Sequence, residues 1–394
     1  MRSARPVLIG LWAAALPFHR SFIGSGVLTR AGLGEWLAPL ALGVLLPAFF
    51  RDKREWRALV PAAIVALGFL PSVICALDRS AALAQWCILV YVASLVALGQ
   101  AASALGYRPA AIAGYVAGTA AACALGLGGM ALAATGHETS LAHLTPWISS
   151  VPRPVGPTAT PNALALEAAV GLVAARELAR GAGTRIRALS IASAVLFSVT
   201  IACSFGHVVF AVLPTVAFLL SRSSNRPTRI ASRVALALSL VLLVLSIRVR
   251  LVPLSSRAPF IDLRPTPYVV AHAIALDELR SSPFVGVGLE CFARAWPLHY
   301  DAARFDQAYV EGQEGSLGVA LDPHSTYLGY LAEAGLFGAA VLVGLGAVAM
   351  RARRRADLAF DALIVFAAVG GVFVDLLTNR ELALAIGLFA TRRR

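Results

Sequence analysis

Two short stretches of the chain place polar residues at the start of an apolar helix. The stretch "DPHST" (322–326) opens one apolar run, and "TPNALALE" (160–167) opens another. Asp322, or the threonine that opens the second stretch, is suited to cap the helix, and the proline after it is favoured at the first helical position. The first turn then offers His324 or Asn162. Free N–H groups and the helix dipole would make both helix starts suitable for binding phosphate.

His324 is the residue of this pair that can transfer a proton. The positive end of the helix dipole disfavours the imidazolium form, and a general base needs neutral imidazole. We therefore expect His324 to accept a proton beside a bound anion. The alternative is that His324 only caps the helix or anchors it at a membrane interface.

Two acids follow within the same apolar runs, Glu167 and Glu333. Ionisable groups in such segments are costly, and they are either functional or paired. Both interpretations stay open for both residues. Nine positions separate His324 from Glu333, which places them on opposite helix faces and argues against direct cooperation.

Arg264 precedes a third polar region, "RPTPYVVAHAIALDELRSSPFVGVGLECF" (264–292). Its pattern predicts a helix of about 14 residues that packs on a bundle or lies against a membrane, followed by a turn at 283–288. The guanidinium of Arg264 suits bidentate binding of phosphate. We interpret the two glycines of the turn as plain turn residues and His272 as a packing or surface residue.

The elements that must position these residues are membrane helices. The 394-residue chain is 58% hydrophobic and only 14% charged, and its mean hydropathy is +0.76. We expect an all-α membrane protein with about twelve transmembrane helices, eleven being possible because two pairs are short or crowded. The apolar segments are 6–24, 34–50, 58–77, 82–100, 109–134, 162–175, 188–203, 206–220, 231–249, 325–350, 358–377 and 381–391.

The loops between these segments alternate in charge. Arginine clusters such as 51–57, 176–187 and 351–355 would lie on one side of the membrane. The positive-inside rule makes that side cytoplasmic, with both termini there. The net charge of +13 is therefore a topology signal and does not indicate nucleic-acid binding. We expect a multi-pass membrane protein; in a bacterium it would lie in the inner membrane, and the opposite face would be the periplasm.

The opposite, periplasmic face receives the two long loops. The expected organisation is 1–249 with about nine helices and a loop at 136–161, a large loop at 250–324, and C-terminal helices at 325–394, together a single membrane domain. The region 1–24 is interpreted as a retained first helix and not as a signal peptide. The five cysteines do not suggest a disulfide framework.

No metal or cofactor is expected. The outer loops contain no Asp-x-Asp pair, the cysteines lack metal-ligand spacing, and the chain has no P-loop or dinucleotide fingerprint. A bound phosphate group would then be held by arginines and helix N-termini instead of a metal ion.

The order of these motifs resembles the O-antigen ligase and O-antigen polymerase superfamily. "PFVGVGLECF" (283–292) is similar to its Pro-x-x-Gly-x-Gly turn, and "DPHSTYLGYLAEAGLFG" (322–338) to its Pro-His-Asn/Ser and Glu-x-Gly-Leu-x-Gly runs. "RPVGPTATPNALA" (153–165) and "DLLTNRELALAIGLF" (375–389) resemble weaker family segments. The resemblance extends over about 150–390.

The resemblance implies a GT-C-like glycosyltransferase that works without a metal. Family members transfer a glycan from undecaprenyl diphosphate to an acceptor, which is lipid A-core in ligases and another lipid-linked glycan in polymerases. By position, His324 matches the essential histidine and Arg264 the arginine that binds the lipid diphosphate. Arg153 matches a second phosphate ligand, and Asn162, Glu167 and Asp322 would support the site. Direct attack on the anomeric carbon would invert its configuration.

One departure from the family pattern concerns positive charge. Where the family has Ser-Arg-Gly, this chain has "SFGH" (204–207), with Phe205 in place of arginine. Either His207 or Arg153 then supplies the charge, or diphosphate binding is altered. We expect ligation first and repeat-unit polymerisation second. A lipid or polysaccharide transporter, which should show matched repeats, and a non-catalytic assembly partner are the alternatives of other classes.

Overall fold

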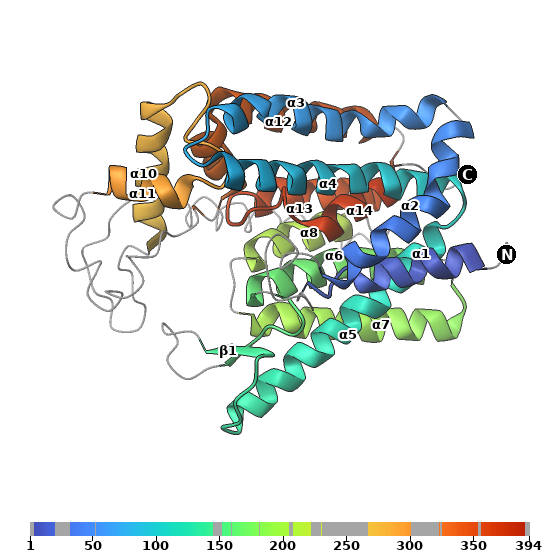
Figure 1. Cartoon of the computed structure of the whole chain (residues 1–394). Helices are drawn as coiled ribbons and strands as arrows, with labels where there is room; N and C mark the ends of the chain where they lie inside the picture. The colour runs from blue at the N-terminus through green and yellow to red at the C-terminus, as the bar shows by residue number, and fades with distance from the viewer. Residues whose placement is uncertain are drawn as a thin grey trace.

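Helices make up nearly all of the secondary structure in the computed structural model of the chain (Figure 1). The structure describes residues 4–19, 32–51, 53–144, 152–158, 160–180, 182–204, 208–221, 230, 267–300, 323, 325–353 and 356–390. The first helices are α1 (Ala4–Ala15), α2 (Leu33–Arg51), the 3-10 helix η2 (Lys53–Leu59), α3 (Val60–Ile74), α4 (Arg79–Ala104) and α5 (Arg108–Ala134). They are followed by α6 (Pro161–Ala179), α7 (Thr184–Cys203), α8 (Val209–Ser221), α10 (Pro267–Ser281), α11 (Phe292–His299), α12 (Thr326–Arg353), α13 (Leu358–Gly370) and α14 (Arg380–Phe389).

Six of the described helices are long and apolar enough to cross a membrane. They cover Leu33–Phe50, Trp56–Ile74, Arg79–Ala104, Arg108–Ala134, Thr184–Cys203 and Thr326–Arg353. Shorter apolar helices cover Ala4–Ala15, Ala211–Leu220 and Leu358–Gly370. This confirms the prediction of a helical membrane protein. The count of twelve crossings and the GT-C-like arrangement stay predictions, and the segment at 231–249 lies outside the described residues.

Small residues let neighbouring helices approach closely. α4 packs along α14, and a Cβ atom on Gly99 would lie 2.6 Å from the Leu384 carbonyl oxygen. A Cβ on Gly387 would lie 2.2 Å from the carbonyl oxygen of Val96. Such contacts are typical of membrane helices, which gain packing energy when small residues bring their backbones together.

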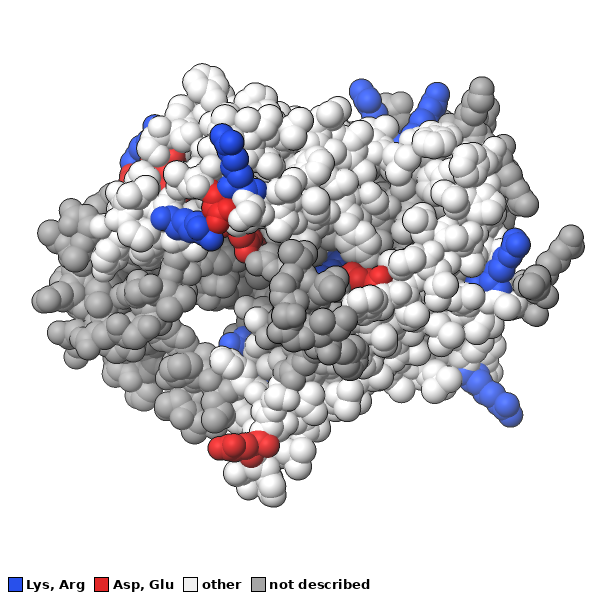
Figure 2. Space-filling view, in the orientation of Figure 1, with Lys and Arg blue, Asp and Glu red and all other residues white. Residues whose placement is uncertain are grey.

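One end of the bundle is held by arginine contacts. Arg108, the first residue of α5, is buried, pairs with Asp357 before α13 and lies 4.9 Å over the ring of Phe389, which ends α14. Arg353 at the end of α12 pairs with Asp361 at 3.2 Å. Figure 2 shows charged side chains mainly toward the two ends of the face in view, with an uncharged surface over much of its middle. This distribution fits helices that run from one membrane surface to the other.

A small antiparallel sheet departs from a purely helical fold. It pairs β1 (Ala142–Leu144) with β2 (Pro152–Pro154), and the register places His143 opposite Arg153. Beyond the sheet, the N–H groups of Val155 and Gly156 donate to the carbonyl oxygen of Leu141 at 2.9 and 3.0 Å. The sheet fixes Arg153 in the predicted loop 136–161.

α13 and α14 form a short antiparallel hairpin. Its outer ends meet, because the N–H of Asp357 donates to the carbonyl oxygen of Phe389 at 3.3 Å. The two helices have 13 and 10 residues, which at about 1.5 Å per residue is well short of an apolar core about 30 Å thick. The connection 371–379 therefore lies within the bundle, where it contacts the start of α12.

α10 and α11 lie beyond the ends of α3 and α4, at the opposite end from the N and C labels in Figure 1. α10 has 15 residues, close to the predicted length, and it packs on α12 and α11. Val270, Ala271, Ile274 and Ala275 are buried, whereas Leu276 is exposed. α10 therefore packs on the bundle through an apolar stripe that contains both small and larger aliphatic residues.

Candidate active site

The turn at 283–288 and α12 hold each other through their backbones. α12 breaks at Gly335, where φ is 56° and ψ is −139°, so the apolar run predicted as one helix at 325–350 is two helical pieces. The bonds across the break are Val287 N to Ala332 O (3.1 Å), Gly288 N to Glu333 O (2.9 Å), Leu336 N to Pro283 O (2.9 Å) and Phe337 N to Phe284 O (3.3 Å). The backbone groups released by the break are thus satisfied by the turn. We name this pairing of Pro283–Gly288 with Ala332–Phe337 the glycine interlock.

Two glycines make the interlock possible. A Cβ on Gly286 would lie 2.2 Å from the carbonyl carbon of Glu333, and a Cβ on Gly335 would lie 2.5 Å from the carbonyl oxygen of Pro283. Both glycines also have positive φ, 66° and 56°, which side chains other than glycine rarely adopt. The interpretation of Gly286 as a plain turn residue is therefore incomplete, because its close approach to α12 is what holds the turn.

α12 begins later than the sequence predicted. Its first residue is Thr326, not Pro323, so Asp322 cannot be its N-cap. Ser325 takes that place: its Oγ accepts a hydrogen bond from Leu328 N at 3.4 Å, as serine commonly does at an N-cap. The N–H of Thr326 donates to the carbonyl oxygen of Gly371 at 2.8 Å. The first N–H of this helix is therefore used within the bundle.

His272 of α10 holds the backbone just before the predicted catalytic histidine. Its side chain is buried, and Nε2 lies 3.1 Å from the carbonyl oxygen of Pro323. A carbonyl oxygen only accepts, so Nε2 must carry a proton. His272 is thus a packing residue, as predicted, but its contact fixes the residue next to His324.

Arg153 and Asn162, two of the residues predicted for a phosphate site, contact each other. Arg153 Nη2 donates to Asn162 Oδ1 at 3.2 Å, and Arg153 Nε donates to the carbonyl oxygen of Ser204. Thr160 caps α6 and accepts from Ala163 N at 3.1 Å, which confirms the predicted helix start. In these two contacts the accepting oxygens are neutral, and the contacts orient the guanidinium.

These contacts place Arg153 beside the end of α7. Ser204 directly precedes Phe205, the position where the family pattern has arginine. The replacement of the missing charge by Arg153 stays a prediction. His324, Arg264, His207 and Asp322 lie outside the described residues, so their roles stay predictions.

Glu167 does not join Arg153 and Asn162. It is fully buried and faces His19 and Glu381, with its Oε1 3.3 Å from His19 Nε2. His19 Nε2 also lies 2.8 Å from Glu381 Oε1. The sequence analysis did not single out His19 or Glu381. Both are ionisable residues within predicted apolar segments, and this was the signal that could have identified them.

An apolar cavity of about 300 Å³ lies between α3, α4, α12, α13 and α14. Tyr327 near the start of α12 and Asn379 just before α14 lie on its wall. Arg57 of η2 and Gln100 near the end of α4 lie on its wall as well. The remaining wall is mostly aliphatic, including Val65, Leu89 and Leu342. Such a lining suits a hydrocarbon chain.

The long apolar helices, with charged residues toward their ends, define a helical membrane protein. Residues 189–343 match the family model described as O-antigen ligase. The match runs from within α7 to within α12 and includes the glycine interlock, and it supports the predicted resemblance to the O-antigen ligase superfamily. It supports a glycosyltransferase-like enzyme of the ligase or polymerase type. No curated protein matches the chain.

Proposed function

We propose that the protein transfers a glycan from undecaprenyl diphosphate to an acceptor hydroxyl at the periplasmic face of the bacterial inner membrane, with both termini cytoplasmic. The acceptor we propose is lipid A-core, which makes the reaction O-antigen ligation. The observation that carries the proposal is the family match over 189–343, which contains both the glycine interlock and His324.

Arginines would bind the diphosphate. Arg153 is held by Asn162 and by the carbonyl oxygen of Ser204, and Arg264 is the second proposed ligand. Their fixed charges would stabilise the leaving diphosphate without a metal ion at that position. Asn162 supports the site by orienting Arg153.

His324 would act as the general base. The acceptor oxygen forms a bond to the anomeric carbon while the bond from that carbon to the diphosphate oxygen breaks. The diphosphate leaves with the electron pair, and His324 takes the proton of the acceptor hydroxyl. A single displacement of this kind inverts the anomeric configuration. The contact of His272 with Pro323 O supports this role because it fixes the backbone next to His324.

The apolar cavity is suited to the lipid part of a substrate. Its walls are largely aliphatic, and Thr326 and Tyr327 on α12 connect it to the stretch that contains His324. A prenyl chain in this cavity would leave its diphosphate near the periplasmic end of the bundle.

The test is a transfer assay with purified protein and lipid-linked donor. We expect His324→Ala and Arg264→Ala to abolish transfer. The matched controls are His137→Ala, in an exposed position after α5, and Arg280→Ala, whose side chain is 73% exposed on α10. If both site variants keep wild-type transfer, the proposed mechanism is wrong.

Gene deletion distinguishes ligase activity from polymerase activity in cells. Loss of a ligase removes polysaccharide from lipid A-core while lipid-linked polymer accumulates. Loss of a polymerase leaves single repeat units on the core. We expect the first pattern when the gene is deleted.

A further inference from the structure

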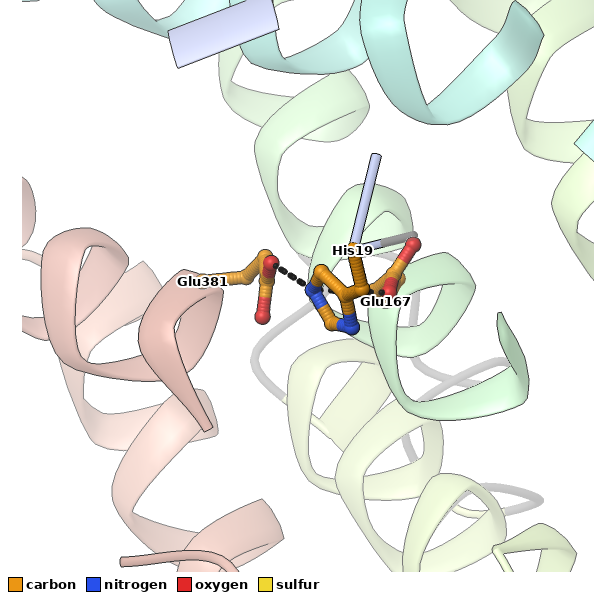
Figure 3. Close-up of side chains that lie close together, drawn as sticks. All are labelled: His19, Glu167 and Glu381. Atoms are coloured by element: carbon orange, nitrogen blue, oxygen red, sulfur yellow. Dashed lines mark hydrogen bonds and ion pairs between the residues drawn. The ribbon is translucent and has the colours of Figure 1, made fainter. Parts of the chain in front are cut away.

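Three ionisable side chains from distant parts of the chain meet inside the bundle. They are His19, which follows α1, Glu167 on α6 and Glu381 on α14, and we name them the buried cluster. In Figure 3 both carboxyl groups point toward the imidazole. His19 Nε2 lies 3.3 Å from Glu167 Oε1 and 2.8 Å from Glu381 Oε1. One oxygen or nitrogen atom from each residue lies within 4.8 Å of the other two.

Several carboxyl oxygens of the cluster have no hydrogen-bond partner among the described residues. The side chain of Glu167 has no exposed surface, and neither carboxyl oxygen has a hydrogen-bond partner among the described residues. Glu381 is 1% exposed, and its Oε2 likewise has no such partner there. Buried carboxylates are normally hydrogen-bonded, paired or bound to a metal.

The charges near the cluster also need a cation. Arg380 Nη1 pairs with Glu35 Oε1 at 2.9 Å, next to the cluster in the bundle. Among these described groups, one arginine faces the three carboxylates of Glu35, Glu167 and Glu381. The three carboxylates outnumber this arginine by two negative charges, which a divalent cation would balance.

We propose that the buried cluster binds a divalent transition-metal ion such as Zn²⁺ or Mn²⁺, with His19 Nε2 and one oxygen each from Glu167 and Glu381 as ligands. Ligand atoms about 2.0–2.2 Å from such an ion lie about 2.9–3.5 Å from one another, close to the two measured separations. The imidazole ligand favours these metals over Mg²⁺ and Ca²⁺, which prefer oxygen alone. His19 keeps 20% exposure, which leaves the ion a route from the surface.

The metal ion would be a fixed part of the bundle. It would join the end of α1 to α6 and α14, and it would not be the charge that stabilises the diphosphate. The inference therefore goes beyond the proposed function, and its test needs no glycan substrate.

The experiment measures metal in the full-length protein, purified in detergent with a tag that contains no histidine. The sample is stripped with a chelator, reloaded with Zn²⁺ or Mn²⁺, dialysed and analysed by mass spectrometry. We expect about one ion per chain. Glu167→Gln and Glu381→Gln keep the side-chain shape and should lower bound metal at least about tenfold. Glu278→Gln, at a buried carboxyl on α10 outside the cluster, is the control that should keep the ion.

Thermal unfolding gives a second readout, in which the unfolding midpoint of each protein with added metal is compared with its own midpoint without metal. Added Zn²⁺ should raise the unfolding midpoint of the stripped wild type, because it binds the folded state, and should not raise that of Glu381→Gln. The proposal is overturned if the wild type takes up no metal, or if Glu167→Gln and Glu381→Gln bind it as well as the wild type.

Two further results would identify another cation in its place. A carboxylic-acid carbonyl band in the infrared spectrum of the wild type, absent from Glu167→Gln, would show a proton in place of the metal. If the wild type binds no metal and Arg20→Gln does, the arginine that follows His19 balances the carboxylate charges in the wild type. Either result overturns the metal site.

Discussion

The glycine interlock and the buried cluster both join segments that are far apart in the chain, but with different atoms. In the interlock, four backbone hydrogen bonds connect Pro283–Gly288 to the break in α12. In the cluster, side chains of His19, Glu167 and Glu381 meet, and Glu167 has no hydrogen-bond partner among the described residues. The interlock is complete without a ligand, whereas the cluster is not.

This difference separates structural from chemical roles. Backbone bonds do not depend on side-chain type, so the interlock needs only glycines where a Cβ would collide. The cluster depends on three particular side chains and pays for burying them unless an ion or a proton joins them. We therefore expect substitutions in the interlock to affect folding most and substitutions at side-chain sites to affect activity most.

The largest effect is expected for Gly335→Ala. The new Cβ would lie 2.5 Å from the carbonyl oxygen of Pro283, at a positive φ that alanine disfavours. Strain and overpacking together should cost at least about 2 kcal/mol. The measurement is the yield of monodisperse protein in detergent and its thermal unfolding midpoint. Gly346→Ala in the same helix is the control, since its Cβ would meet nothing within 4 Å; equal losses in both would refute the interlock.

The next effect is expected at Arg153. Arg153→Ala should lower the rate of glycan transfer about 10²–10³-fold, because a fixed charge at the diphosphate is lost, while folding changes little. Arg153→Lys should recover only part of the rate, since lysine lacks the planar fork. Rates are measured at saturating donor. Arg180→Ala, an exposed position after α6, serves as control, and wild-type rates in Arg153→Ala would remove this residue from the site.

A smaller effect is expected when the contact of His272 is removed. His272→Ala loses the hydrogen bond to Pro323 O, and we expect kcat to fall about tenfold, equivalent to about 1.4 kcal/mol, with KM for the lipid donor nearly unchanged. His272→Gln can donate from a similar position and should restore most of kcat. An equal fall of kcat in both variants would contradict a positioning role, because it would show that the hydrogen bond to Pro323 O does not matter.

The smallest effect concerns α10 and the pH. Burial raises the pKa of Glu278 from 4.5 to about 8. The folded state then keeps a proton that the unfolded state releases, so stability falls as pH rises between 4.5 and about 8. Glu278→Gln should flatten this slope in thermal unfolding and stabilise the protein at the upper end of that range. Asp277→Asn, at a residue that pairs with Arg280, should leave the slope in place.

The sequence was sufficient for the class of fold because membrane helices are defined by long apolar runs and arginine-rich ends. It could not predict the break in α12, since Gly335 looks like any small residue in an apolar helix until the turn at Gly286 is placed against it. The proline in "DPHST" also misplaced the start of α12, because Ser325, three residues after Asp322, is an equally good cap and the bonds to 371–376 favour it.

Contacts between candidate residues were predictable where those residues lie in one short stretch. Arg153 and Asn162 are nine positions apart and could be paired from a short stretch. The buried cluster draws single residues from positions 19, 167 and 381, and no spacing rule connects residues so far apart in the chain. His272 likewise gave no signal, because its partner is a backbone carbonyl that only the packing of α10 on α12 brings near.

The hairpin of α13 and α14 has a consequence for how the polypeptide is threaded through the bilayer. It begins and ends at the same end of the bundle, where Asp357 meets Phe389. Whether the hairpin counts as two membrane crossings or as none, the chain leaves it on the side of the membrane from which it entered. We therefore expect the arginines at 392–394 on the same side of the membrane as those at 351–355, whether or not this pair of helices enters the membrane fully.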